Sequence, residues 1–306
     1  MKGLELSRAH WGEVVAPAVA ARLPALLPRL AAGLAGEGSE CFGFDDDLSR
    51  DHDFDPSPCL WLSASDFASH GDSLGVLVES LPPPPRAALL TPEGRGRRGV
   101  HETEAFYRRF LGLPREPRTL DEWRAASEAG LAAATNGEVF ADPLAGFTAV
   151  RDALLAFYPD DLRLERLARR LHAAGQSGQY NWNRCRRRGE VVAASLALAE
   201  FVDAALAVVF LLARRYRPFP KWAHRALGDL PQPGPRLHAL LAELVAAPSS
   251  SPALVLGLVE EIAALLADSL RAEGLSSTPS DFLVDHAREV GGLVSDPLLR
   301  RRTAAP

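Results

Sequence analysis

Lysine and cysteine are both scarce in this chain of 306 residues. Only Lys2 and Lys221 are lysines, so arginine supplies nearly all of the positive charge. The three cysteines, Cys41, Cys59 and Cys185, are too few and too scattered for a disulfide framework or a Cys-x-x-Cys metal site. The first residues also lack the pattern of a cleavable export signal. We therefore expect a cytoplasmic protein.

The chain has no surplus of positive charge. Its formal net charge is −5, which argues against general binding to a phosphate backbone and makes nucleic acid an unfavoured partner. Hydrophobic residues make up 47% of the sequence and charged residues 24%, as in a soluble globular protein. At this length, two domains that share an interface are a better expectation than one continuous core.

Long apolar runs are missing as well, with the exception of residues 191–213. Glu200 and Asp203 lie near the middle of this run, and each would be costly at the centre of a bilayer. The run therefore predicts a buried bundle helix, and we expect no membrane partner. Two roles are open for the two acids: a base that activates an acceptor, or members of a structural ion pair.

The first third of the sequence reads as a mixture of helices and short strands. Prolines interrupt the apolar helical spacing near the N-terminus, which predicts two helical pieces there. A run of four prolines ends a later helix. The expected elements are helical pieces within 4–30, strands at 31–37, 51–62 and 98–104, and helices at 64–80 and through 107–110.

Beyond about residue 117 the strand signals fade and helical patterns follow one another. The fold class predicted from this order is α+β. A small mixed β-sheet core with helices occupies 1–118, and an all-α helical bundle that covers the cleft occupies 119–306. The expected bundle helices are 120–134, 147–157, 162–188, 190–216, 235–246, 253–273 and 279–289.

A glycine-serine turn and a pair of aspartates are the strongest candidates for a site. Asp51 and Asp53 follow Gly38 and Ser39 after eleven intervening residues. Glycine lets backbone N–H groups approach a triphosphate closely. Two acids at i and i+2 on a strand point to the same face, roughly 7 Å apart, which suits Mg²⁺ or Mn²⁺. Each motif alone is ordinary turn chemistry, but their spacing favours phosphoryl chemistry.

A third carboxylate usually completes such a metal site and can help to deprotonate an acceptor. Glu102 is our choice because it lies in the next extended segment; Glu104 is the fallback. A surface acid at a strand end is the plain alternative for Glu102. The loop acids Asp45, Asp46 and Asp47 either form a solvated turn or lie near the metal.

The helical half offers further candidates for phosphate contacts. Residues 176–188 are unusually polar for a bundle helix, and their arginines include Arg184 and Arg187. Guanidinium groups clamp phosphate oxygens bidentately, although a solvated basic helix face is the alternative. Lys221 follows the long apolar helix and is the one lysine after residue 2. We expect Arg184, Arg187 and Lys221 as second-rank nucleotide-binding residues.

These motifs together resemble a known group. Gly-Ser followed by Asp-x-Asp is similar to the nucleotidyltransferase superfamily that includes DNA polymerase beta and the aminoglycoside nucleotidyltransferases. The strings GSECFGFDDDLSRDHDF, GQYNWNR and YRPFPKW resemble more narrowly the DUF4037 family, over most of residues 30–230. The resemblance implies that the small sheet is a nucleotidyltransferase core, that Gly38 and Ser39 hold nucleotide phosphates, and that Asp51 and Asp53 bind metal.

We therefore expect a Mg²⁺-dependent nucleotidyltransferase that moves a nucleoside monophosphate from a nucleoside triphosphate, with ATP favoured, to a hydroxyl group. Asp51, Asp53 and Glu102 are its expected catalytic and metal residues. A small molecule is the favoured acceptor, and a protein side chain or an RNA end are alternatives. A catalytically weak nucleotide-binding or antitoxin-like module is the rival interpretation. A purely structural helical protein ranks last.

Overall fold

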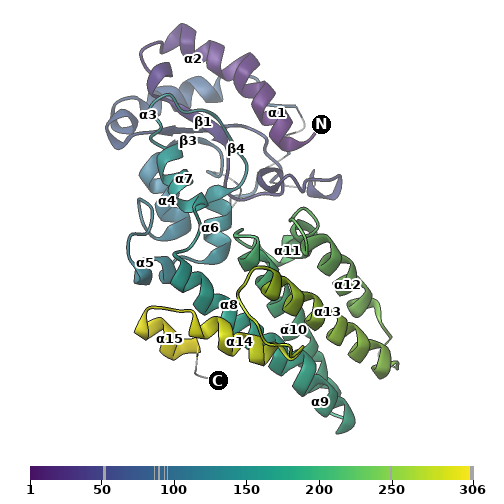
Figure 1. Ribbon diagram of the computed structural model, residues 1–306. Coiled ribbons are helices and arrows are strands. Elements are labelled where there is room, and N and C mark those ends of the chain that lie inside the picture. Colours follow the sequence, from purple (N-terminus) through teal and green to yellow (C-terminus); the bar gives the residue numbers. More distant parts are fainter. Residues whose placement is uncertain are drawn as a thin grey trace. The chain divides into compact units, whose positions relative to one another are not determined.

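The computed structural model (Figure 1) shows two compact units, Met1–Ala156 and Phe157–Pro306. For Arg50 it describes the backbone alone. The residues that the structure describes are 1–50, 53–85, 87–88, 90–92, 94, 96–248 and 250–303.

A helical stretch begins the first unit. It consists of α1 (Gly3–His10), the π-helical turn η1 (Trp11–Val15) and α2 (Ala16–Arg22), and the 3₁₀ turn η2 (Leu27–Arg29) follows it. Pro17 is one of the prolines that were expected to interrupt the N-terminal helical spacing, and that expectation is wrong for it, because it occupies one of the first two positions of α2. At such a position the missing N–H breaks no bond of that helix. The helix ends only before Pro24.

Four short strands form the mixed sheet that the sequence predicts. They are β1 (Ala31–Leu34), β2 (Cys59–Leu62), β3 (Gly99–Glu102) and β4 (Glu138–Ala141), and the segments between the first three contain η3 (Glu40–Phe42), η4 (Leu48–Arg50) and α3 (Ala64–Glu79). The order in the sheet is β3-β2-β1-β4. β1 runs antiparallel to both of its neighbours, whereas β2 and β3 are parallel and are joined through α3. Such a parallel pair needs a long crossover, which α3 provides.

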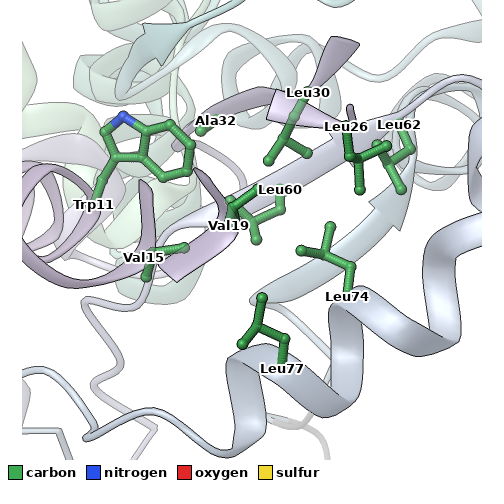
Figure 2. Packing of buried hydrophobic residues seen from close by; sticks show 10 residues of the cluster. All are labelled: Trp11, Val15, Val19, Leu26, Leu30, Ala32, Leu60, Leu62, Leu74 and Leu77. Carbon is green, nitrogen blue, oxygen red and sulfur yellow. The ribbon is translucent and has the colours of Figure 1, made fainter. Parts of the chain in front are cut away.

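Alternation along β2 gives the sheet two different faces. Leu60 and Leu62 point toward the N-terminal helical stretch and α3, where they join a buried cluster (Figure 2). Trp61 points the other way and stacks on Phe147 with ring centroids 3.8 Å apart. The Phe106 ring lies 5.4 Å from Trp61 in an edge contact. The sheet is therefore covered on both faces, which fixes the positions of its strand ends.

The first unit extends further along the chain than the sequence predicts. After β3 it contains α4 (Thr103–Leu111), α5 (Leu120–Ala125), α6 (Glu128–Thr135) and α7 (Thr148–Leu155). Because β4 pairs with β1, the structure moves the boundary from residue 118 to Ala156. The expectation that strands end near residue 117 is wrong for this reason.

In the second unit every described element is helical, as expected for a bundle. The elements are α8 (Asp160–Ala174), the π-helical η5 (Gly175–Trp182), α9 (Asn183–Arg187), α10 (Val191–Leu212), α11 (Pro220–Leu227), α12 (Gly234–Ala246), α13 (Pro252–Ala272), α14 (Leu283–Gly292) and α15 (Pro297–Thr303). α8, η5 and α9 follow one another without a break, and α8 packs against α10 and α14.

α10 is the long apolar run. Among the described residues it is the one helix long and apolar enough to cross a membrane, yet 61% of its apolar window is buried. Core helices of soluble proteins pass the same criteria. Residues 204–212 are buried, while Glu200 and Asp203 are exposed. Asp203 forms ion pairs with Arg170 at 2.9 Å and Arg217 at 2.5 Å, which supports the structural alternative for this acid.

The polar string GQYNWNR begins inside η5, and close packing explains part of it. A Cβ atom on Gly178 would lie 2.3 Å from the ring of buried Phe201. The amide nitrogen of Gln179 donates to the Glu260 carboxylate at 2.8 Å, and its oxygen accepts from the Leu283 N–H at 2.9 Å. Gln179 thereby joins η5 to α13 and α14.

Gly178→Ala is expected to lower the free energy of unfolding by about 1–3 kcal/mol, because the new methyl group overlaps a packed ring. Gly257→Ala is the matched control in α13. Its Cβ would meet nothing within 4 Å, so we expect a gain of about 0.4–1 kcal/mol from the loss of unfolded-state freedom. Urea unfolding of both variants measures the difference. A Gly178→Ala protein as stable as the wild type would contradict the packing argument.

Candidate functional site

The turn that follows β1 has a backbone that suits glycine. Gly36 and Gly38 have φ angles of +109° and +115°, which are strained for other residues. A Cβ on Gly38 would also lie 2.5 Å from the carboxylate of Glu40. The side chain of Asn136 fixes the start of the turn, since it accepts from Gly36 N–H at 2.9 Å and donates to the Gly36 carbonyl at 2.7 Å.

This turn presents polar groups that have no partner in the described part of the chain. Within the described residues, the backbone N–H groups of Glu37, Gly38 and Ser39 have no acceptor, and the Ser39 hydroxyl has no hydrogen-bond partner. All three residues are partly exposed. Adjacent N–H groups in a turn with glycines at positive φ form a concave anion-binding surface. The turn can therefore bind phosphate oxygens through its backbone.

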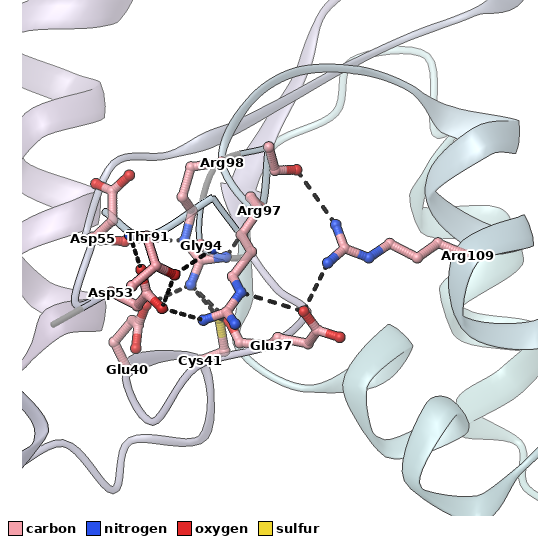
Figure 3. A network of polar contacts seen from close by, with 12 residues as sticks. Glu37, Glu40, Cys41, Asp53, Asp55, Thr91, Gly94, Arg97, Arg98 and Arg109 are labelled. Carbon is pink, nitrogen blue, oxygen red and sulfur yellow. Dashed lines mark hydrogen bonds and ion pairs between the residues drawn. The ribbon is translucent and has the colours of Figure 1, made fainter. Parts of the chain in front are cut away.

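A buried arginine holds the turn in place (Figure 3). The Arg98 guanidinium donates to the Glu40 carboxylate at 2.5 Å and to the Glu37 carbonyl at 2.8 Å. It also donates to the Asp55 carbonyl at 3.0 Å and contacts the Cys41 sulfur at 3.1 Å. The side chains of Arg98 and Glu40 are only 4% and 2% exposed. The start of β3 is thus connected to the turn through a desolvated ion pair.

Asp53 lies near this turn, but it does not lie on a strand. Its φ is +54°, and β2 begins only at Cys59. One carboxylate oxygen accepts from Thr91 N–H and the other from the Thr91 hydroxyl, both at 2.7 Å. Asp51 lies outside the described residues, and so does His52. The expectation that a strand over 51–62 aims both acids at one face is therefore corrected for Asp53.

The described residues do not by themselves fit a magnesium site. They contain no group of three acidic, histidine or cysteine side chains that could hold a metal ion. Both oxygens of Asp53 are engaged by Thr91. A metal site here depends on Asp51, so the Mg²⁺ or Mn²⁺ assignment stays a prediction.

An open cavity of about 200 Å³ lies beside β3 and adjoins the turn. Three phenylalanines give it an apolar wall, and five titratable side chains give it polar groups. Its lining consists of Ala35, Gly36, Glu37, Phe67, Arg97, Val100, His101, Glu102, Ala105, Phe106, Arg109 and Phe110. A cavity with an apolar wall and a few converging polar groups is the usual form of a small-molecule site.

His101 contributes a neutral imidazole to this cavity. Burial, and then the positive charges of Arg98 and Arg109, lower the pKa of His101 to about 4. Its Nε2 atom is buried and has no hydrogen-bond partner among the described residues. Such an atom can form a hydrogen bond with a ligand without first losing one to the protein.

Glu102 lines the same cavity, but it lies at the far end of β3. It pairs with Leu62, whereas Gly99 at the start of β3 pairs with Cys59. Three residues of strand span about 10 Å, so Glu102 is separated from the end of β3 where Arg98 holds the turn. Its carboxylate has no recorded partner among the described residues. The fallback residue, Glu104, is exposed in α4 and is not part of the cavity lining.

The second-rank candidates lie in the second unit. Arg184 in α9 places its guanidinium over the Tyr180 ring at 4.8 Å, and Lys221 in α11 lies 5.4 Å from the Trp222 ring. Arg187 is exposed at the end of α9. Their assignment to nucleotide binding stays a prediction.

Sequence reasoning missed five residues of this site: Glu37, Arg97, Arg98, His101 and Arg109. The adjacent pair Arg97-Arg98 at the start of an expected strand was one available signal. Neighbouring side chains there point to opposite faces, so one of the two arginines was bound to face the core and to need a charge partner. No local pattern marks Arg109, whose partner Glu37 is 72 residues away.

A comparison with known protein families supports the DUF4037 resemblance for the strings in the second half of the chain. The model of the domain of unknown function DUF4037 matches residues 123–223, about a third of the chain. The match contains the strings GQYNWNR and YRPFPKW and supports that family. It does not reach the glycine turn, Asp53 or the cavity. No curated protein and no solved structure was found to be similar to this chain.

Proposed function

We propose that the chain is a nucleotidyltransferase that moves a nucleoside monophosphate from a nucleoside triphosphate, with ATP favoured, to a hydroxyl group of a small molecule. The observation that carries this proposal is the turn after β1, where the N–H groups of Glu37, Gly38 and Ser39 have no acceptor among the described residues and lie in a backbone that suits glycine. Arg97 connects Asp53 to the turn, because its guanidinium lies 4.0 Å from the Asp53 carboxylate and 3.4 Å from the carboxylate of Glu37.

In the proposed reaction, the acceptor hydroxyl oxygen attacks the α-phosphorus and forms a new P–O bond. The bond from that phosphorus to the bridging oxygen breaks, and pyrophosphate leaves with the electron pair. Glu102 lines the cavity and its carboxylate has no partner among the described residues, so we assign it the role of accepting the hydroxyl proton. The turn amides and the Ser39 hydroxyl hold the phosphates. Mg²⁺ or Mn²⁺ at Asp51 and Asp53 remains part of the proposal as a prediction.

The position of Glu102 at the end of β3 remote from Arg98 favours one alternative. Without a third acid at the metal, the chain would bind a nucleotide and transfer nothing, as a regulatory or antitoxin-like module does. A protein side chain or an RNA end as acceptor is a further variant of the transferase proposal. The cavity of about 200 Å³ suits part of a small molecule.

The test combines ATP binding with transfer. Asp51→Asn together with Asp53→Asn is expected to weaken binding of ATP with Mg²⁺ about tenfold or more in calorimetry, and to reduce transfer of α-labelled phosphate from ATP into a metabolite extract on the order of 100-fold. The control pair, Asp72→Asn with Glu79→Gln, removes the same charge from exposed positions of α3. It is expected to change neither quantity.

The outcomes separate the alternatives. Unchanged ATP binding in the double variant Asp51→Asn, Asp53→Asn would contradict the assignment of these residues to binding metal and the nucleotide phosphates. ATP binding without any labelled product from the four common nucleoside triphosphates would favour the binding module. Label that appears in protein or RNA fractions, and not in small molecules, would change the acceptor class.

A further inference from the structure

Two arginines converge on one carboxylate at the wall of the cavity (Figure 3). The Glu37 carboxylate accepts from Arg109 at 2.7 Å and lies 3.4 Å from Nε of Arg97. All three side chains line the cavity. They come from the glycine turn, from the segment before β3 and from α4, which are separate parts of the chain that meet here.

Stability is a weak explanation for this cluster. The side chains of Glu37, Arg97 and Arg109 are 34%, 25% and 42% exposed, and ion pairs at such positions contribute little to folding. The contacts of Arg97 are also long, at 3.4 Å to Glu37 and 4.0 Å to Asp53. Its Nε atom is buried and has no hydrogen-bond partner of good geometry in the described part of the chain. The Arg97 guanidinium is therefore incompletely satisfied, whereas that of Arg109 donates to Glu37 at 2.7 Å and to the Gly96 carbonyl at 3.3 Å.

The charges indicate which ligand the two guanidinium groups would bind. Glu37 is the one carboxylate, among the described residues, that both guanidinium groups share. The second carboxylate near Arg97, that of Asp53, lies 4.0 Å away and accepts hydrogen bonds from Thr91. A phosphoryl group has more acceptor oxygens than a carboxylate and can bind two guanidinium groups through parallel hydrogen bonds. Arg98 holds the Glu37 carbonyl at 2.8 Å, so the backbone stays in place, and the partly exposed carboxylate moves aside by rotation of the Glu37 side chain.

We propose that Arg97 and Arg109 form a phosphate clamp that the Glu37 carboxylate occupies in the free protein, and that a phosphoryl group binds by displacing Glu37. This inference rests on the proposed function, because it assigns the clamp to the same site. The phosphoryl group belongs either to the nucleotide or to a phosphorylated acceptor. Glu37 acts as an internal competitor that lowers the affinity for phosphate and closes the clamp when no ligand is bound.

The test measures binding of tripolyphosphate by calorimetry in the absence of divalent metal. Glu37→Gln removes the competing charge and is expected to strengthen binding about tenfold, while Arg109→Gln is expected to weaken it about tenfold. Arg109 is partly exposed on α4, so its replacement leaves the fold intact. Arg109→Lys keeps the charge without the planar fork and is expected to restore part of the affinity.

The matched controls come from another ion pair of the same unit. Glu116 and Arg118 lie 2.9 Å apart with side chains 27% and 65% exposed. Glu116→Gln and Arg118→Gln change the net charge as the test variants do, so they report any general electrostatic effect. Both are expected to leave tripolyphosphate binding within twofold of the wild type.

The proposal is overturned if Glu37→Gln binds tripolyphosphate no more tightly than the wild type, or if Arg109→Gln binds it equally well. Two further ligands identify the source of the phosphoryl group. A response of ATP affinity to both variants assigns the clamp to the nucleotide, and a response of glucose 6-phosphate alone assigns it to an acceptor. Tripolyphosphate binding that follows these expectations without nucleotidyl transfer would leave the clamp in place and remove the proposed function.

Discussion

Replacing Arg98 by methionine is expected to lower the free energy of unfolding by about 3–5 kcal/mol, because the change leaves the Glu40 carboxylate buried without its charge partner. The two side chains are 4% and 2% exposed, so water replaces little of the lost interaction. The same variant also loses the hydrogen bonds from Arg98 to the carbonyls of Glu37 and Asp55. We therefore expect ATP binding to weaken in protein that remains folded.

A double variant separates the cost of leaving Glu40 without its charge partner from the cost of forming a cavity. Glu40→Leu together with Arg98→Met removes both charges, and it is expected to recover at least half of the stability that Arg98→Met loses. Urea unfolding measures the stability of the whole chain. Hydrogen exchange in peptides of β2 and β3 then measures the stability of the first unit alone. A loss below about 1 kcal/mol for Arg98→Met would show that Glu40 reaches water or a proton.

The stability of the first unit is expected to fall by about 2 kcal/mol between pH 7 and pH 5 because of His101. Its pKa is about 4 in the folded protein and about 6.5 in an unfolded chain. The stabilising contribution is therefore fully present above the unfolded value. As the pH falls from about 6.5 toward 4, the unfolded chain takes up a proton that folded His101 does not.

His101→Gln isolates this contribution from the carboxylates that also titrate. The wild type and the variant are compared at both pH values by urea unfolding and hydrogen exchange of β3. The stability of the variant at pH 7 gives the cost of the substitution itself. The loss of stability between pH 7 and pH 5 is expected to be smaller in the variant, and the difference between the two losses is the contribution of the imidazole. Parallel pH profiles for the two proteins would rule out a neutral buried His101.

The sequence predicted those parts of the fold that depend on local patterns. The helical half and the glycine turn were readable from periodicity and turn chemistry, because both are set by residues a few positions apart. β4 was missed because Glu138–Ala141 is only four residues long and lies between the helical segments α6 and α7, so the sequence around it shows a helical pattern. The tertiary pairing with β1, more than a hundred residues earlier in the chain, makes this segment a strand.

The candidate site was predicted only in part, for the same physical reason. The Asp-x-Asp spacing looked like an alternating strand, yet a contact with Thr91, 38 residues away, fixes Asp53 in a turn. Arg98 reaches Glu40 across 58 residues and Arg109 reaches Glu37 across 72. Contacts of this range leave no periodic signal, so an arginine that holds a turn looks like any other arginine in a sequence.

The position of β1 in the sheet has a consequence for the order of folding. β1 is an inner strand, and the partners on its two sides are made later, β2 from Cys59 and β4 from Glu138. One edge of β1 therefore stays open while about a hundred further residues leave the ribosome. Pairings between such distant segments carry a loop-closure cost and slow the search for the native sheet. Until Ala141 is made, the chain beside the glycine turn exposes a strand edge that a second nascent chain can pair with.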